Sequence, residues 1–532
     1  MSRRLVITGR FSAALRRRAP TFALIGAAAA LAFQLGGCAV GPDYHRPDTA
    51  VPAAYKEAPE GFKVAQPADM ADRGTWWLIY DDAQLNGLMD QLNANNQTVA
   101  QYAAAYRQAR ALVGEARAAY FPVVSASFSG TRSRTPTRVS NASGSFPSGN
   151  ITNNVNLGLD ATWEPDLWGK VSRTVSAEEA GQQGAAADLA NARLSAQATL
   201  AQTYFTLRAL DAQQKLLDDT VAAYQKSLTL TQNQYAQGVA GRADVIQAQT
   251  QLQSAQAAAI DNGVARAQDE HAIAVLVGQP ASSFSIAASP LTATPPTVPL
   301  TMPSALLERR PDIASAERKA AAANEQIGVA ISAFFPTLTL SASGGFESSV
   351  FSQLLQMPSR FWTLGPSLAA TIFDAGLRSA QTQAARAAYD QQVAAYRQTV
   401  LAAFQDVEDN LASQRILAQE VVVQQQAVES AQHALSIVTN EYKAGTTDYQ
   451  NVLSAQTTAF TAQQKLASIA GERMVSSVGL VKALGGGWDA AQMDRESGGV
   501  AAPAPASAAS ASGAAASTTA ADTQRALNVQ PQ

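Results

Sequence analysis

Four stretches of the chain alternate apolar with small or polar residues. In the clearest of them, Val155, Leu157 and Leu159 are separated by polar Asn156 and by Gly158. This period of two is that of a β-strand, in which successive side chains point to opposite faces. The same alternation recurs in three further stretches, at 124–128, 338–342 and 362–372. We therefore predict four strands in two consecutive pairs.

The paired strands enclose polar loops at 131–149 and 347–360. Pro366 interrupts the fourth strand and weakens its prediction, because proline cannot donate a ladder hydrogen bond. Segments of about ten residues with one apolar and one small, polar face are typical of a membrane barrel with a wet lumen. A hairpin half-buried on a soluble core shows the same alternation, so the pattern alone leaves both interpretations open.

Two much longer stretches, 169–237 and 376–444, contain no proline and have the pattern of continuous helix. Some 70 helical residues extend for about 100 Å, which is wider than an ordinary domain core. Helices of that length are expected to pack side by side as coiled coils. Their apolar positions are often alanine, which lets helix backbones approach closely. Each long helix ends at a glycine turn, after which we predict a shorter returning helix.

The chain contains two copies of one structural unit. Residues 114–130 and 328–344 align without a gap over a glycine, an aromatic-Phe-Pro triplet and an alternating strand. The turns that end the two long helices match as well, at 235–238 and 442–445. Each copy begins with a helix that a Phe-Pro pair ends, at about 97–120 and 311–334.

The start of the chain has the features of an export signal. A run of arginines precedes the apolar stretch 21–35, which is too short for a comfortable membrane span. Small residues before Cys38 resemble the lipobox of bacterial lipoproteins, which implies cleavage before Cys38 and acylation of its thiol and new amino group. An ordinary signal peptide with an incidental cysteine is the alternative. Ala39 favours the outer membrane over inner-membrane retention.

The order of these elements divides the chain into six segments. They are a signal peptide (1–37), a lipidated N-terminal segment with the start of the helical bundle (38–96), a first repeat (97–288), a linker (289–310), a second repeat (311–490) and a disordered Ala/Ser-rich tail (491–532). Each repeat comprises a helix, a β-hairpin and a long helical hairpin.

Composition narrows the function classes. The formal net charge is −3 and only 15% of residues are charged, so nothing points to a nucleic-acid partner. Cys38 is the only cysteine, which excludes a disulfide within one chain and a cysteine-based metal site. The histidines are scattered at no metal-ligand spacing. We predict that the protein is not an enzyme and carries no cofactor or metal beyond its covalent lipid.

Two local clusters have competing interpretations. Asp406, Glu408 and Asp409 would form a carboxylate pair if they lined a cleft, but on a helix we expect them on a solvated or tunnel-lining face. Trp76 and Trp77 suit a ligand platform, although an anchor on the helix bundle is the interpretation that we favour.

Four strands per chain are too few to close a transmembrane barrel, because about eight is the smallest known. An open sheet edge in lipid would leave backbone groups without hydrogen-bond partners. If the strands span a membrane, several copies of the chain must therefore share one barrel. Two copies give eight strands with a filled interior, and three give twelve with room for a water-filled bore.

Several motifs resemble the outer-membrane factor (TolC-like) family, and within it the efflux lipoproteins of the OprM/NodT type. The resemblance covers residues 20 to 490. The motifs that carry it are Cys-Ala-Val-Gly-Pro-Asp-Tyr-His-Arg-Pro at 38–47, Trp76-Trp77, Asp-Asp-Ala-Gln-Leu at 81–85, Glu-Arg-Arg-Pro-Asp-Ile at 308–313 and the two junctions Asp-Leu-Trp-Gly at 166–169 and Phe-Asp-Ala-Gly at 373–376.

The resemblance implies a mixed α/β membrane protein. Each chain would be a two-repeat protomer of a trimeric 12-stranded β-barrel continued by a 12-helix periplasmic α-barrel. It also implies a passive exit duct for drugs and other small molecules in a tripartite efflux pump. The implied partners are two further copies of the chain, a periplasmic adaptor and an inner-membrane transporter of the resistance-nodulation-division class. The implied lipid on Cys38 is a diacylglycerol with an N-acyl chain. A TolC-like outlet for type I protein secretion is the alternative, and a periplasmic hydrolase or fibrous adhesin fits the sequence less well.

The resemblance places a gate and adaptor contact at the periplasmic tips of the helical hairpins. For Asp244 a gating role and a helix-capping role stay equally open, and for Asp448 we favour gating. Tyrosine hydrogen bonds between helices are expected to hold the tips shut. The matching positions are Tyr235, Gly238, Arg242 and Asp244 in the first repeat and Tyr442, Gly445, Asp448, Tyr449 and Asn451 in the second.

Overall fold

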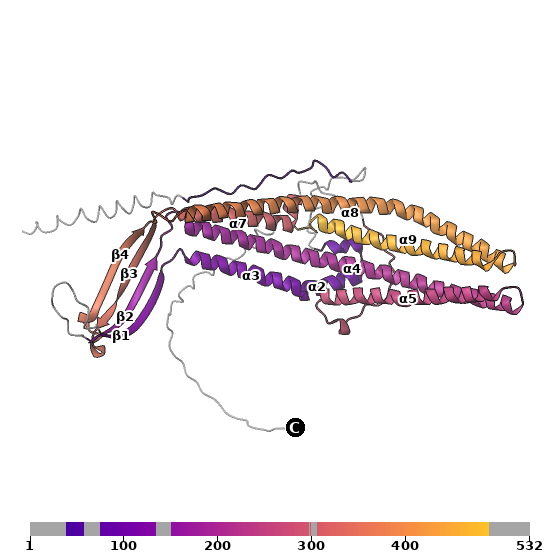
Figure 1. Ribbon diagram of the computed structural model, residues 1–532, viewed down its shortest axis with the longest axis horizontal. Helices are drawn as coiled ribbons and strands as arrows, with labels where there is room; N and C mark the ends of the chain where they lie inside the picture. Colours follow the sequence, from indigo (N-terminus) through magenta and orange to yellow (C-terminus); the bar gives the residue numbers. More distant parts are fainter. Residues whose placement is uncertain (1–38, 58–74, 135–150, 297, 299–305, 489–532) are drawn as a thin grey trace, which may run out of the picture.

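The computed structural model describes residues 39–57, 75–134, 151–296, 298 and 306–488. The predicted signal peptide, Cys38 and the predicted tail lie outside these residues. The described chain is elongated, with a β-sheet at one end and the tips of two helical hairpins at the other (Figure 1). Within the described part, no helix is both long and apolar enough to cross a membrane.

The two repeats contain helices of equal length. Each repeat has one helix of 22 residues, one of 67 and one of 35. In repeat 1 they are α3 (Gln97–Ala118), α4 (Lys170–Ala236) and α5 (Arg242–Leu276), and in repeat 2 they are α7 (Pro311–Ser332), α8 (Leu377–Lys443) and α9 (Tyr449–Ala483). At 1.5 Å per residue, α4 and α8 each extend for about 100 Å, as predicted.

Shorter elements surround these six helices. Near the N-terminus, η2 (Trp76–Tyr80) and α2 (Ala83–Asn95) pack on the middle of the bundle. Trp76 and Trp77 are both buried there, which confirms the anchor interpretation. The remaining short helices are η3 (Ala281–Ser283), α6 (Leu306–Arg309), η5 (Phe351–Gln353) and η6 (Met357–Ser359).

The four strands form one antiparallel sheet in the order β1-β2-β3-β4. The strands are β1 (Val123–Arg134), β2 (Ile151–Trp163), β3 (Thr337–Ser348) and β4 (Arg360–Ala369). Pro366 lies within β4, opposite Leu340 of β3. Because β4 is an edge strand in this sheet, the missing proline N–H interrupts no ladder on its outer side.

Several strand boundaries differ from the prediction. β1 continues to Arg134 and β3 to Ser348, into the stretches predicted as loops. β4 ends at Ala369, so the predicted continuation to Ile372 is wrong. The carbonyl of Thr371 instead accepts a hydrogen bond of 2.8 Å from Arg378 Nη2 at the start of α8. The chain therefore turns toward the helix before the sequence alternation ends.

The apolar positions of the four strands align across the sheet. Val124 pairs with Ala161, Ala161 with Ala342, and Ala342 with Leu364. In the neighbouring row on the other face, Ser125 pairs with Asp160, which pairs with Ser343. Val124 and Leu364 are 66% and 68% exposed. One face of the sheet is therefore apolar, and the rest of the described chain leaves it uncovered.

The helices form a layer with α4 near its middle. α4 contacts α3 and α5 on one side and α7 and α9 on the other, and α8 packs on α7 and α9. In Figure 1, α3 and α5 follow one another along one border of the layer, and α8 runs along the other border. The largest apolar core lies where η2 and α2 meet α4, α5 and α9.

The two strand-to-helix junctions have the same construction. Gly169 and Gly376 precede the long helices with φ of +78° and +90°, which is left-handed backbone that favours glycine. Asp166 accepts hydrogen bonds from the first free N–H groups of α4, at Val171 and Ser172. Asp374 does the same for Arg378 in α8. Both predicted junction motifs therefore cap a long helix.

Candidate functional site at the helix tips

The turns at the helix tips depend on Gly238 and Gly445. Both glycines have φ of +74°, in the left-handed region, and a Cβ atom at either position would meet nothing within 4 Å. Backbone conformation rather than crowding is therefore what requires glycine here. In each turn the next N–H returns to the helix, from Val239 to the carbonyl of Gln234 and from Thr446 to that of Glu441.

Tyr442 and Tyr449 fasten one helical hairpin to the other within a single chain. They lie at the end of α8 and the start of α9, and they are 6% and 2% exposed. Tyr442 Oη donates to Thr231 Oγ1 of α4 at 3.4 Å, and Tyr449 Oη lies 3.4 Å from Ser227 Oγ of the same helix. The two rings are 5.4 Å apart. The predicted tyrosine bonds between helices are thus formed.

Apolar packing reinforces these long hydrogen bonds. The two tyrosines share one cluster with apolar side chains from all four tip helices, including Leu228, Leu252 and Val452. Burial raises the pKa of both Tyr442 and Tyr449, and the charge of Asp244 acts in the same direction. Both phenols therefore stay neutral donors at physiological pH.

Asp244 and Asp448 occupy different environments. Asp244 Oδ2 accepts a hydrogen bond of 3.0 Å from the N–H of Gly241 at the start of α5. Asp448 occupies the N-cap position of α9, is exposed and forms no side-chain cap bond. The capping role is therefore formed at Asp244 but not at Asp448. Whether either carboxylate controls ion passage stays a prediction.

The remaining tip positions lie outside the tyrosine cluster. Tyr235 is 48% exposed, although it corresponds to buried Tyr442 in the repeat alignment. Arg242 is the first residue of α5, is exposed and forms no ion pair within the described residues. Asn451 donates to Thr447 Oγ1 within its own turn. The structure thus brings together Tyr442, Tyr449 and Asp244 and leaves the other predicted tip residues on the surface.

Sequence reasoning missed the partners of the tip tyrosines. Thr231 and Ser227 lie more than 200 positions earlier in the chain. Tyr224 of α4 accepts a hydrogen bond of 3.1 Å from Gln251 of α5 in the same cluster. The only available signal was the helical spacing of Tyr224, Ser227 and Thr231 on one face of α4.

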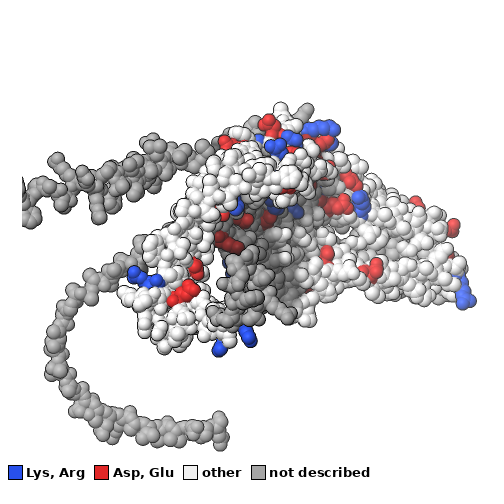
Figure 2. Space-filling view, turned by 60° about the vertical axis from the view of Figure 1, so that its left-hand side comes forward, with Lys and Arg blue, Asp and Glu red and all other residues white. Residues whose placement is uncertain are grey.

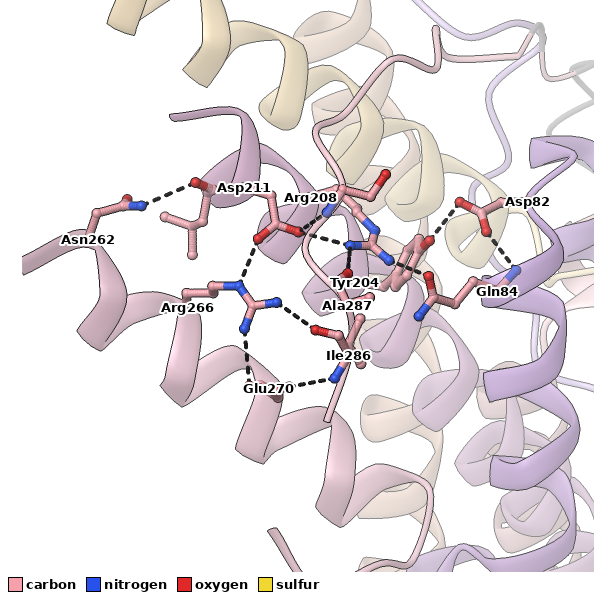
Figure 3. A network of polar contacts seen from close by, with 12 residues as sticks. Asp82, Gln84, Tyr204, Arg208, Asp211, Asn262, Arg266, Glu270, Ile286 and Ala287 are labelled. Atoms are coloured by element: carbon pink, nitrogen blue, oxygen red, sulfur yellow. Dashed lines mark hydrogen bonds and ion pairs between the residues drawn. The ribbon is translucent and has the colours of Figure 1, made fainter. Parts of the chain in front are cut away.

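A buried ionic network in the middle of repeat 1 was also missed (Figure 3). Asp211 accepts from Arg208 at 2.8 Å and from Arg266 at 2.7 Å. Glu270 pairs with Arg266 at 3.1 Å and accepts from the N–H of Ile286. Burial opposes the charge of Arg266, yet the hydrogen bond and charge of Asp211 raise its pKa. The network joins α4 and α5 to the segment that follows α5.

The acidic cluster on α8 lies on a largely solvated face, as predicted, because Asp406 and Asp409 are exposed and Glu408 is half-buried. Asp406 pairs with Arg310 at 3.1 Å, and Glu408 accepts hydrogen bonds from the N–H groups of Lys56 and Glu57. Asp409 accepts from Gln405 of the same helix. The three carboxylates therefore serve separate structural contacts and do not form a catalytic pair.

Charged side chains are unevenly distributed over the molecule. On the face in Figure 2, acidic and basic residues gather over the helical layer, and most of the remaining surface is uncharged. Isolated side chains of both signs appear toward the helix-tip end. The described residues contain no group of three or more side chains suited to hold a metal ion.

The sequence matches one known protein family over most of its length. A family model described as "Outer membrane efflux protein" matches residues 88–279 and 302–486. The probable efflux pump outer membrane protein TtgC of Pseudomonas putida is 34% identical over 469 residues, covering 86% of this chain and 95% of the relative. The pyoverdine export outer membrane protein OpmQ of Pseudomonas aeruginosa is 30% identical over 466 residues, covering 87% and 96%.

Solved structures show the same fold. The outer-membrane channel OprN superposes with a TM-score of 0.76 at 30% identity, covering 85% of this chain and 100% of that one. The MtrE outer membrane channel of Neisseria gonorrhoeae in its open state gives 0.74 at 27% identity, covering 85% and 98%. The predicted fold class and outer-membrane location are confirmed, and the protein-secretion alternative is not favoured. The chain belongs to the outer membrane efflux protein family, as the outer-membrane channel of an efflux pump.

Proposed function

We propose that three copies of the chain assemble into one passive duct through which small organic molecules leave the periplasm. The observation that carries this proposal is the sheet of four strands with two unpaired edges, β1 and β4. An open edge in lipid leaves a row of backbone groups without hydrogen bonds, at several kcal/mol each. Three copies bring twelve strands, which close a barrel around a water-filled bore, whereas two copies bring eight around a filled one.

The helical layer supports the same assembly. Its two borders, α3 with α5 on one side and α8 on the other, expose large apolar side chains that the described residues leave uncovered. Examples are Ile260 and Val264 of α5, and Ile416 and Val423 of α8, which are all more than half exposed. A neighbouring copy would bury both borders and continue the layer into a closed tunnel.

The helix tips would close this tunnel on the periplasmic side. Tyr442 and Tyr449 hold the second hairpin on the first, so opening has to separate contacts within each protomer as well as between protomers. Three exposed Asp448 carboxylates around the axis would favour cations. We infer that a periplasmic adaptor meets the tips at the turns of Gly238 and Gly445, and that the transporter is of the resistance-nodulation-division class.

A lipid on Cys38 would anchor the sheet end of the protomer. The next residue, Ala39, packs against Gly169 at the junction between sheet and helices, and Val40 donates to the carbonyl of Trp168. Acyl chains at position 38 would therefore enter the membrane beside the barrel. Each buried CH₂ contributes about 0.8 kcal/mol, so a diacylglycerol with an N-acyl chain anchors firmly.

Deletion of this protein alone tests the proposed export. We expect the deletion strain to accumulate small apolar antibiotics or solvents and to secrete its proteins normally. Complementation with the wild-type chain should restore export, and a chain with Cys38→Ser serves as the control for anchoring. Unchanged accumulation together with loss of a secreted protein would contradict the proposal and favour protein secretion.

A further inference from the structure

The ionic network of repeat 1 has a counterpart position in repeat 2. In repeat 1, Arg208 and Arg266 approach the carboxylate of Asp211 from two helices (Figure 3). Asp211 is only 5% exposed, and its second oxygen also accepts from the N–H of Ser289 at 2.9 Å. One buried carboxylate thus satisfies two guanidinium groups and a backbone donor.

Repeat 2 retains the arginines of this network and lacks its acids. Because the paired helices have equal lengths, residues correspond by their place from the first residue of each helix. Arg208 then corresponds to Arg415 and Arg266 to Arg473. The acids have no counterpart, because Asp211 corresponds to Ala418 and Glu270 to Ser477.

A cavity of about 430 Å³ lies where the missing carboxylates would be. Its walls include all four corresponding residues of repeat 2. Arg473 Nε is buried and has no hydrogen-bond partner among the described residues. Arg415 pairs with Glu57, and the hydroxyl of Ser477 is occupied by Tyr80. Both arginines therefore line the cavity, and the guanidinium group of Arg473 has a donor that the described residues leave unused.

Apolar side chains form the rest of the cavity wall. Pro295 and Pro296 of the segment between the repeats line it together with Leu411 of α8 and Leu480 of α9. A cavity of this size and lining suits a small organic molecule. A fully hydrated inorganic anion would satisfy the guanidinium groups but would gain nothing from these walls.

We propose that Arg415 and Arg473 form a binding site for a small organic carboxylate with an apolar body, which takes the place that Asp211 fills in repeat 1. The carboxylate accepts hydrogen bonds from both guanidinium groups, and the apolar body packs between the prolines and leucines. The proposal stands independently of the export function.

Ligand-observed ¹⁹F NMR on the full-length protein in mild detergent tests this site. The probe is 4-(trifluoromethyl)benzoate, and 4-(trifluoromethyl)benzyl alcohol is the uncharged control. We expect saturable line broadening of the benzoate alone, with displacement by unlabelled benzoate and little displacement by inorganic phosphate at the same concentration. Equal broadening of the alcohol, or equal displacement by phosphate, would overturn the proposal.

Variants locate the binding. Arg473→Gln should weaken benzoate binding about tenfold or more, as expected for the loss of one charge-assisted pair. Arg386→Gln, which removes an exposed arginine of α8 outside the cavity, should leave it unchanged.

Ala418→Asp restores the carboxylate of repeat 1 and keeps both arginines, so it tests the site even if Arg473→Gln folds poorly. It should abolish benzoate binding and raise the thermal unfolding midpoint. Undiminished binding in Ala418→Asp, or no binding to the wild-type protein because a neighbouring copy fills the cavity, would contradict the inference.

Discussion

Repeat 1 and repeat 2 have helices of the same lengths, but they differ in the middle of the helical bundle and at the helix tips. In the middle of the bundle, which we call the joint, repeat 1 buries Asp211 between two arginines, and repeat 2 has a cavity lined by the corresponding arginines. At the tip the asymmetry is reversed, because repeat 2 supplies the buried Tyr442 and repeat 1 leaves the corresponding Tyr235 exposed. The two repeats therefore share their helix lengths and differ in the side chains at the joint and at the tip.

This difference indicates a division of roles. The buried network of repeat 1 fixes α4 and α5 to the segment that leads into repeat 2. The tyrosines of repeat 2 hold its hairpin on α4 through two hydrogen bonds of 3.4 Å and one apolar cluster. Repeat 1 is thus held rigid by buried ion pairs. Repeat 2 is attached to it at the tip by long hydrogen bonds and apolar packing, which are easier to separate than those ion pairs.

Loss of the ionic network at the joint of repeat 1 should have the largest effect on stability. Asp211→Ala leaves Arg208 and Arg266 without their shared carboxylate, and we expect a loss of about 3–5 kcal/mol in unfolding free energy. Asp219→Ala removes a well-exposed carboxylate from the same helix and should cost less than about 0.5 kcal/mol. Thermal and denaturant unfolding of the purified proteins measures both. Equal midpoints for the two variants would show that the network contributes nothing to the joint.

The tip tyrosines should show the next largest contrast. Tyr442→Ala removes a buried ring between α8 and α4, and we expect a local loss of about 3 kcal/mol and a higher open-channel fraction. Tyr235→Ala, at the corresponding exposed position, should leave both unchanged. Single-channel recordings in planar bilayers measure the open fraction. A larger effect of Tyr235→Ala would reverse the assignment of the fastening contact.

The two repeats cap their long helices in the same way, so loss of either cap should destabilise its helix by a similar amount. Asp166→Ala and Asp374→Ala each remove the cap of a long helix, and each should cost about 1 kcal/mol. Hydrogen exchange of the first turns of α4 and α8 reports this fraying separately for each helix. Faster exchange in only one of the two helices would break the symmetry that we infer at the sheet end.

The smallest expected effects distinguish the two aspartates of the tips. Asp244→Ala removes the acceptor of the Gly241 N–H and should destabilise the start of α5 by about 0.5–1 kcal/mol. Asp448→Ala breaks no side-chain cap and should change only the cation preference of the channel. Hydrogen exchange and reversal potentials separate these results. A loss of cation preference in Asp244→Ala alone would exchange the two roles.

The fold was largely predictable because its signals are local. The period of the strands, the absence of proline from 169–237 and 376–444 and the glycines at the turns each act over a few residues. The end of β4 was missed because its position depends on the bond between Arg378 and Thr371. That contact lies in the turn between β4 and α8, and the alternation of apolar and polar residues does not reveal it.

The candidate site was predicted only in part. The glycine turns, the tyrosines and the capping role considered for Asp244 follow from their spacing around the turns. The partners Thr231 and Ser227 and the ionic network of Asp211 join elements that only the packed bundle brings together. Single-sequence reasoning also cannot tell which of two aligned tyrosines is buried, because burial depends on the neighbouring hairpin.

Native mass spectrometry of the protein extracted from outer membranes in mild detergent tests the central claim most directly. Because one chain brings four strands with two free edges, we predict a single species with three times the mass of the lipidated chain. Disulfides between Ser127→Cys in β1 and Thr363→Cys in β4 should link copies into a covalent ring. A stable monomer without cross-links would contradict a barrel shared between copies.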